Sequence, residues 1–211
     1  MVPLIVASVI ASNADELKKI LEKLRGHVSA IQLDFMDGNF VRSHSLDFAI
    51  TLPACFNYEA HLMVESPTKW IHRLPDRIEK VIAHVESEDD VDEIISECRH
   101  LNKTIFLALN PKSGVDLIKP YIMKIDGILI MSVEPGQYGA KFLPFTLEKI
   151  YPLRRMRDNI IIEVDGGMKP STARQAFLAG ADIITSGSFL VNNDDIDKSM
   201  KELNQSIFED E

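Results

Sequence analysis

The sequence predicts an α/β fold, a (β/α)8 TIM barrel that forms a single domain over residues 1–211. Strand-like and helix-like segments alternate along the whole chain with no linker between them, which is typical of parallel strands. Eight such units, at roughly 26 residues each, are enough to close a small barrel. The runner-up is an open doubly wound sheet, which usually has a glycine-rich phosphate loop after its first strand. Residues 7–11 contain no glycine, so we favour the barrel.

Eight strands are expected from short runs of apolar or alternating residues that end at turn-forming residues. In chain order they are residues 4–8, 31–34, 58–63, 77–84, 104–109, 127–131, 159–165 and 181–186. The fifth strand ends at Asn110-Pro111, and the sixth is followed by a long loop at residues 134–142. Loops of this length at strand ends often act as lids over a site.

Helices are expected between these strands. The first runs from a cap at Ser12 or Asn13 to about residue 24, because its apolar residues then fall on one face. Prolines favour the end of a short helix at residues 47–52 and the start of another at residues 68–74. The acidic run at residues 86–90 suits a helix start, where the dipole favours negative charge. Later helices are expected at residues 146–157, at residues 171–178 with Ser171 as the cap, and from Asp194 onward.

Composition limits the classes of function. The net charge is -9, whereas a nucleic-acid or anionic-membrane binder needs a basic face, so neither partner is expected. An anionic small substrate would need a local positive site. Cys55 and Cys98 are too few for a disulfide framework and fit reduced thiols. With no signal-peptide pattern and no run long enough to span a bilayer, the expected location is cytoplasmic.

Two of the expected strands end on an aspartate that is followed by glycine within a few residues. Asp34 precedes Gly38, and Asp165 precedes Gly166-Gly167. The strand ends of a barrel share one mouth, so the two carboxylates are expected to face each other there. Such a pair suits proton removal and return. Taken alone, Asp34 is better explained as a strand-ending aspartate that accepts hydrogen bonds from loop amides.

The mouth of the barrel is expected to collect side chains from many strands. They include Ser8, Asp34, His61, His84, Met131, Asp165 and Gly187. Barrels frequently bind phosphate at the loops after their last two strands, through backbone amides and a short helix N-terminus. Gly166-Gly167 and Gly187-Ser188 stand in these two places. We therefore predict a phosphate site there, since amides can hold an anion on an acidic protein.

Strings of residues in a fixed order carry a resemblance to a known family. They are Ala7-Ser8-Val9-Ile10, Leu33-Asp34-Phe35-Met36-Asp37-Gly38-Asn39-Phe40-Val41, His61-Leu62-Met63-Val64, Leu107-Ala108-Leu109-Asn110-Pro111, Ile130-Met131-Ser132-Val133-Glu134-Pro135-Gly136, Glu163-Val164-Asp165-Gly166-Gly167 and Ser186-Gly187-Ser188. From Leu4 to about Leu190 the chain resembles ribulose-phosphate 3-epimerase. The resemblance implies a barrel of the ribulose-phosphate-binding type that interconverts D-ribulose 5-phosphate and D-xylulose 5-phosphate, in the pentose phosphate pathway. It also implies a homo-oligomer, a dimer or higher.

The resemblance assigns roles to particular residues. Asp34 and Asp165 match the two acid/base groups and, with His61, the ligands of one divalent ion (Zn, Mn, Fe, Co or Mg) that stabilises an enediolate. The other matches are Ser8 and His61 at the substrate, Met36, Met63 and Met131 around the enediolate, Gly136 and Gly139 in the closing loop, and Gly166, Gly167, Gly187 and Ser188 at the phosphate. For the methionines alone, core packing is the simpler explanation.

Gln32 departs from the family, which has a metal-ligand histidine two residues before the first catalytic aspartate. Residues 32 and 34 point to the same face of a strand, so Gln32 still looks into the mouth. A neutral amide oxygen is a poorer ligand than imidazole for zinc or iron. We therefore expect weaker metal binding, a shift toward magnesium or manganese, or no metal.

Two loops depart as well. Arg42-Ser43-His44 follows Val41 where the family usually has Pro-Asn, and Gln137-Tyr138 stands in the lid where the family has Phe-Gly. Tyrosine in place of glycine is expected to stiffen the lid and reshape the pocket. Arg42 or His44 could contact a phosphate, or simply be exposed in its loop. These departures put the substrate in question more than the fold.

Two other functions stay open beside the leading one. The first is an epimerase or lyase for another ketose phosphate through the same enediolate, which the altered loops favour. The second is a catalytically silent barrel that binds a sugar phosphate or a protein partner, which Gln32 favours.

Overall fold

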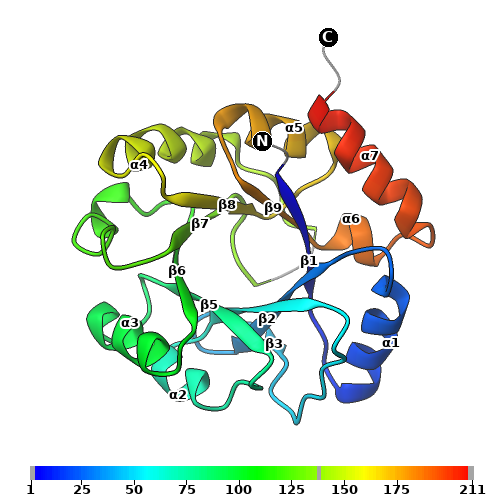
Figure 1. Ribbon diagram of the computed structural model, residues 1–211, viewed down its shortest axis with the longest axis horizontal. Helices are drawn as coiled ribbons and strands as arrows, with labels where there is room; N and C mark the ends of the chain where they lie inside the picture. Colours follow the sequence, from blue (N-terminus) through cyan, green and yellow to red (C-terminus); the bar gives the residue numbers. More distant parts are fainter. Residues whose placement is uncertain (1–2, 137–138, 209–211) are drawn as a thin grey trace.

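In the computed structural model, which describes residues 3–136 and 139–208, the parallel strands close into a ring (Figure 1). Among these residues the ring comprises β1 (Leu4–Val9), β2 (Ala30–Asp37), β4 (Asn57–Met63), β5 (Ile78–His84), β6 (Thr104–Leu109), β7 (Gly127–Met131), β8 (Ile161–Asp165) and β9 (Ile183–Ser186). β1 pairs in parallel with both β2 and β9, which closes the ring. The predicted barrel is thus confirmed.

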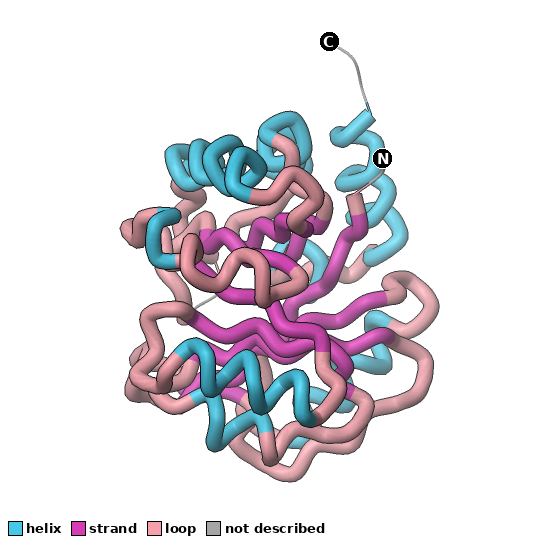
Figure 2. The backbone as a smooth tube through the Cα atoms, turned by 60° about the vertical axis from the view of Figure 1, so that its left-hand side comes forward, coloured by secondary structure: helices cyan, strands magenta, loops and turns pink. Residues whose placement is uncertain are grey.

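Helices cover the outside of the ring, as Figure 1 shows along the barrel and Figure 2 shows from the side. They are α1 (Ala14–Leu24), α2 (Pro67–Ile71), α3 (Val91–His100), α4 (Ile150–Met156), α5 (Pro170–Ala179), α6 (Ser188–Val191) and α7 (Ile196–Phe208), with 3-10 turns at Val115–Leu117 and Pro144–Lys149. In the part of the chain that is described, no helix combines the length and the apolar character needed to cross a membrane.

The helix starts follow the expected capping chemistry in two cases. The Asn13 side chain accepts a hydrogen bond from the Glu16 amide at the start of α1, and the Asp90 side chain accepts from two backbone amides at the start of α3. Ser171 is not a cap, contrary to expectation. α5 begins one residue earlier at Pro170, because proline fits the first helical position, where no amide donor is required.

The helix expected at residues 47–52 does not form. Instead, β3 (His44–Ser45) pairs antiparallel with the end of β2, and the chain then runs without regular structure to β4. Leu46 adopts a positive φ of 59° directly after β3, which is incompatible with starting a helix there. The second strand of the barrel is therefore followed by a loop, and the expectation of a helix after every strand was wrong here.

Asp34 also lies inside its strand rather than at the end. β2 continues to Asp37, because Met36 and Asp37 pair with Ser45 and His44 of β3, and Met36 also pairs with Met63 of β4. Asp37 is the aspartate that accepts hydrogen bonds from loop amides, those of Asn39, Phe40 and Glu65. The simpler explanation considered for Asp34 thus applies to Asp37, and Asp34 needs other partners.

One layer below the mouth, the barrel interior holds a buried ion cluster. Lys80 Nζ lies 2.5 Å from Glu163 Oε2, 2.8 Å from Glu59 Oε2 and 3.9 Å from the centre of the Phe106 ring. The Thr185 hydroxyl donates to the other oxygen of Glu163. Burial and the charge of Glu163 raise the pKa of Glu59 well above its ordinary value. Burial opposes ionisation of Glu163 too, but Lys80 outweighs it and lowers the pKa of Glu163.

The Lys80→Met variant tests this cluster. It keeps the length of the side chain but leaves the buried Glu163 carboxylate without its cation, so the free energy of unfolding should fall by about 3–5 kcal/mol. Chemical denaturation measures the change. Lys124→Met is the matched control, since Lys124 pairs with Asp92 on the exposed surface and should cost less than about 1 kcal/mol. Equal losses in the two variants would contradict the assignment.

Candidate active site

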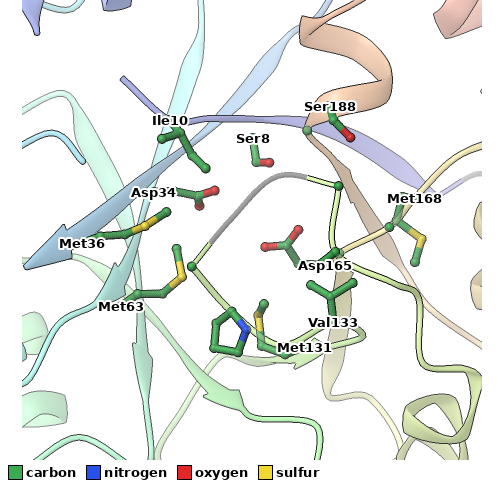
Figure 3. A pocket seen from close by; sticks show the side chains of 17 residues that line it. Ser8, Ile10, Asp34, Met36, Met63, Met131, Val133, Asp165, Met168 and Ser188 are labelled. Atoms are coloured by element: carbon green, nitrogen blue, oxygen red, sulfur yellow. The ribbon is translucent and has the colours of Figure 1, made fainter. Parts of the chain in front are cut away.

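The carboxyl ends of the strands and the loops that follow them enclose a cavity (Figure 3). Most of the residues expected at the mouth line it: Ser8, Asp34, Met36, Met63, Met131, Gly136, Gly139, Asp165, Gly166, Gly167, Gly187 and Ser188. His61 and Gln32 do not line the cavity. They are fully buried behind the carboxylates and reach the site through contacts with them.

Asp34 and Asp165 project into the cavity from different parts of the ring. Asp34 stands on β2 and Asp165 ends β8, and Figure 3 shows their carboxylates pointing toward each other. His61 is the partner of Asp34 in the register between β2 and β4. Its Nδ1 lies 3.3 Å from Asp34 Oδ1 and 3.5 Å from Asp165 Oδ2. The barrel thus assembles two carboxylates and one imidazole from three strands.

Gln32 joins the two carboxylates. Its Nε2 donates to Asp34 Oδ1 at 2.8 Å and to Asp165 Oδ2 at 2.9 Å. An amide nitrogen has two hydrogens, so these bonds use both, and the 3.3 Å approach of His61 Nδ1 is proximity only. Gln32 Oε1 is buried with no partner. The negative carboxylates determine which end of the amide faces them.

The donor atoms fit a divalent metal ion. One ligand atom each from Asp34, His61 and Asp165 lies within 4.8 Å of the others, and all three residues are buried. Carboxylate and imidazole are common ligands of zinc, iron and manganese. The unpartnered Oε1 of Gln32 adds a potential oxygen ligand beside them, available if the amide turns over. Asp34, His61 and Asp165 therefore fit a divalent metal ion, and Gln32 lies beside these three residues.

The electrostatics of the site are dominated by burial. Burial raises the pKa of Asp34, and although the hydrogen bond to His61 opposes this, the net value is about 6. Burial alone would lower the pKa of His61, but its interactions with Asp165 and Asp34 outweigh it and raise the pKa to about 9. Without a metal, His61 therefore carries the positive charge that lets two carboxylates share one buried site.

The part of the cavity formed by the loops after β8 and β9 is built largely from backbone. Gly166 and Gly167 follow β8, and Gly187 and Ser188 lead into α6. Gly166 has a φ of 112°, and a Cβ there would lie 2.4 Å from a methyl group of Val133, so only glycine fits. The described lining residues include no lysine or arginine. An anion at this end would depend on backbone amides, as the sequence predicts.

Apolar residues complete the walls. Met36, Met63 and Met131 lie on one side of the cavity in Figure 3, and all three are buried. The sequence analysis missed Ile10, Val133, Pro135, Ala140 and Met168, which also line the cavity. Ile10 follows Ser8 at strand spacing, so the two-residue period could have found it. The others lie in loops, which have no such period.

The departures at Arg42 and His44 can be placed in the structure. Arg42 and His44 are exposed, and Arg42 lines a second pocket that shares Pro135 and Gly136 with the cavity. Gln137 and Tyr138 lie outside the described residues. His84 does not line the cavity, but its Nε2 lies 2.9 Å from Nε2 of His61.

Comparison with known proteins gives one family. A family model described as the ribulose-phosphate 3 epimerase family matches residues 4–191. The ribulose-phosphate 3-epimerase of Schizosaccharomyces pombe is 30% identical over 213 residues, covering 96% of this chain and 93% of that protein. The enzyme of the same name from Bacillus subtilis is 30% identical and covers 97% of both chains.

Solved structures support the fold at low sequence identity. KGPDC from Streptococcus mutans has a TM-score of 0.72 at 12% identity, and the match covers 98% of both chains. The 3-hexulose-6-phosphate synthase of Salmonella typhimurium has a TM-score of 0.69 at 11% identity, covering 97% of this chain and 98% of that one.

Replacing Gln32 by histidine tests its position beside the metal ligands. Imidazole binds zinc better than an amide oxygen, so Gln32→His should tighten zinc binding by roughly tenfold or more. Competition with a chelating dye measures the affinity. Gln175→His, at an exposed glutamine of α5, is the matched control and should change nothing. Unchanged zinc affinity in Gln32→His would remove this residue from the coordination argument.

The charge on His61 predicts a pH dependence of stability in the metal-free protein. The folded chain holds this proton up to a pKa of about 9, whereas the ordinary value is 6.5. The stabilisation is complete below pH 6.5 and is lost as the pH rises to about 9, on the order of 3 kcal/mol. Denaturation in chelator at several pH values measures it. His61→Asn should flatten the slope, and His72→Asn, at an exposed histidine, should keep it; equal slopes would refute the assignment.

Proposed function

The chain belongs to the ribulose-phosphate 3-epimerase family, and we propose from this membership that it interconverts D-ribulose 5-phosphate and D-xylulose 5-phosphate. It is accordingly an isomerase, of the class that epimerises carbohydrates. The observation that carries the proposal is the pair of buried carboxylates that face each other across the cavity, Asp34 and Asp165.

Inversion at C3 needs a proton acceptor on one face of the carbon and a proton donor on the other. With the sugar between them, one aspartate removes the C3 proton and the other returns a proton from the opposite side. The roles exchange when the reaction runs backward. Burial raises the pKa of Asp34 to about 6 in the metal-free protein, which favours uptake of a proton by this group.

The enediolate formed between these two steps carries negative charge that the site has to stabilise. Asp34, His61 and Asp165 would hold a divalent ion, with Gln32 beside them, and that ion would supply positive charge to the oxygens on C2 and C3. Met36, Met63 and Met131 present polarizable thioethers and exclude water from the same region. Exclusion of water strengthens each electrostatic contact with the intermediate.

The phosphate orients the sugar. Backbone amides at Gly166, Gly167, Gly187 and Ser188 would bind it at one end of the cavity, which sets C3 between the carboxylates. Ser8 lies in the same wall and would contact the sugar. Gly136 and Gly139 belong to the loop over the cavity and would close it around the bound substrate.

The reaction can be tested directly by incubating ribulose 5-phosphate with the protein in D2O. Epimerisation through proton exchange should yield xylulose 5-phosphate with deuterium at C3, which NMR detects after the protein and metal are removed. Parallel samples with zinc, manganese, magnesium or chelator show which ion supports the reaction. Folded protein that gives no exchange in any sample would refute the proposal and direct the search to other ketose phosphates.

Asp34→Asn and Asp165→Asn test the two carboxylates in the same assay. Each variant removes one proton-transfer group, so kcat should fall by about 10²–10⁴-fold. Asp92→Asn, at an exposed aspartate of α3, is the control and should keep full activity. If either active-site variant retained activity, the two-carboxylate mechanism would be wrong, and a thermal melt would show that each variant is folded.

A further inference from the structure

A line of buried polar contacts leads away from the cavity behind His61. His61 Nε2 lies 2.9 Å from His84 Nε2, on the neighbouring strand β5, and both side chains are fully buried. His84 Nδ1 lies 3.3 Å from Oε2 of Glu86. The two rings are nearly parallel, with planes 21° apart. The mechanism above uses neither His84 nor Glu86.

The far end of this line is fixed in place. The second carboxylate oxygen of Glu86, Oε1, accepts the backbone amide of Asn110 at 2.9 Å, and the Ser113 hydroxyl also bonds to the carboxylate. Burial raises the pKa of Glu86, but the interactions with His84, the Ser113 hydroxyl and the Asn110 amide outweigh it and lower the pKa below its ordinary value. Phe40 packs against the His84 ring at 4.7 Å between ring centres. Glu86 is therefore an ionised acceptor that is held at a fixed position.

The fixed acceptor determines where the protons lie. An ionised carboxylate accepts only, so Nδ1 of His84 must carry a proton to bond with Glu86. The two Nε2 atoms lie 2.9 Å apart and can share only one proton, and a His61 ring that offers Nδ1 to a metal ion carries that proton itself, which leaves the His84 ring with its single proton on Nδ1. Its Nε2 is then an acceptor. His61 must in turn donate from Nε2, and its Nδ1 is directed at Asp34 and Asp165.

We propose that His84 and Glu86 are positioning residues. They fix the orientation of the His61 ring and keep a proton on its Nε2, so that Nδ1 faces Asp34 and Asp165. A histidine that binds a metal usually donates its other ring nitrogen to an acceptor, and this fixes both the tautomer and the orientation. Here a second histidine, oriented by a carboxylate, is the acceptor. The contribution to catalysis rests on the proposed function, whereas the contribution to proton placement does not.

NMR of the metal-free protein with 15N-labelled histidine tests the proton placement. His84 should be protonated at Nδ1 and not at Nε2. In Glu86→Gln, the new amide can donate to Nδ1 instead of accepting from it, so the His84 proton should move to Nε2. A His84 ring protonated at Nε2 in the unaltered protein would overturn the proposal, as would an unchanged spectrum in Glu86→Gln.

Metal affinity gives a second readout that involves no substrate. Glu86→Gln and His84→Phe should each weaken zinc binding by about 10–100-fold, the usual effect of removing such a partner of a ligand. The matched controls are Glu97→Gln and His72→Phe, which alter a surface His–Glu pair with a separation of 3.1 Å. Equal affinities in all four variants would overturn the proposal. If His84→Phe failed to fold, the zinc affinity of Glu86→Gln would still test the proposal, because this substitution preserves the shape of the side chain.

Turnover separates this proposal from the proposed function. If the chain is an epimerase, Glu86→Gln should lower kcat with little change in KM, because the phosphate end of the cavity is untouched. A merely structural role would lower stability without moving the histidine proton. Absence of epimerase activity in the unaltered protein would refute the proposed function and leave the NMR and zinc results standing.

Discussion

Two buried carboxylates that face each other are the constraint on which the site depends. Burial makes ionisation of Asp34 unfavourable, and the charge of the neighbouring Asp165 carboxylate adds to this. Two neighbouring side chains stabilise the carboxylates. The His61 imidazole contributes positive charge, and the Gln32 amide donates hydrogen bonds. A divalent ion at the same place would serve the same purpose with more charge. The need of the two aspartates for nearby positive charge and hydrogen-bond donors thus explains why His61 and Gln32 lie beside them.

The same requirement recurs one layer deeper. Glu59 and Glu163 lie two residues before His61 and Asp165 on their strands, and Lys80 lies four residues before His84. In this lower layer the pair of carboxylates is balanced by a lysine. Only the upper layer opens to the cavity, so only there can a substrate meet the charges. Alternation along each strand therefore stacks a structural ion cluster beneath a reactive one.

The phosphate end of the cavity has a different basis. A protein with a net charge of -9 offers no general attraction for a sugar phosphate. Backbone amides exposed at glycines and at the start of α6 provide local donors without any basic side chain. The positive φ of Gly166 and its contact with Val133 show that the backbone there has to take a shape that other residues would not allow.

The sequence by itself determined the barrel and the composition of its mouth. Short apolar runs bounded by turn residues located strands such as Thr104–Leu109 and Gly127–Met131 to the residue, because that pattern is local. Local pattern could not show that β3 would pair with the end of β2, which replaced a helix with a loop and moved the end of the strand from Asp34 to Asp37. Nor could it show that Gln32 bridges both aspartates, or that His84 and Glu86 support His61. The contacts of Gln32 with Asp165 and of His61 with His84 join different strands, and only the assembled barrel brings these residues within hydrogen-bond distance.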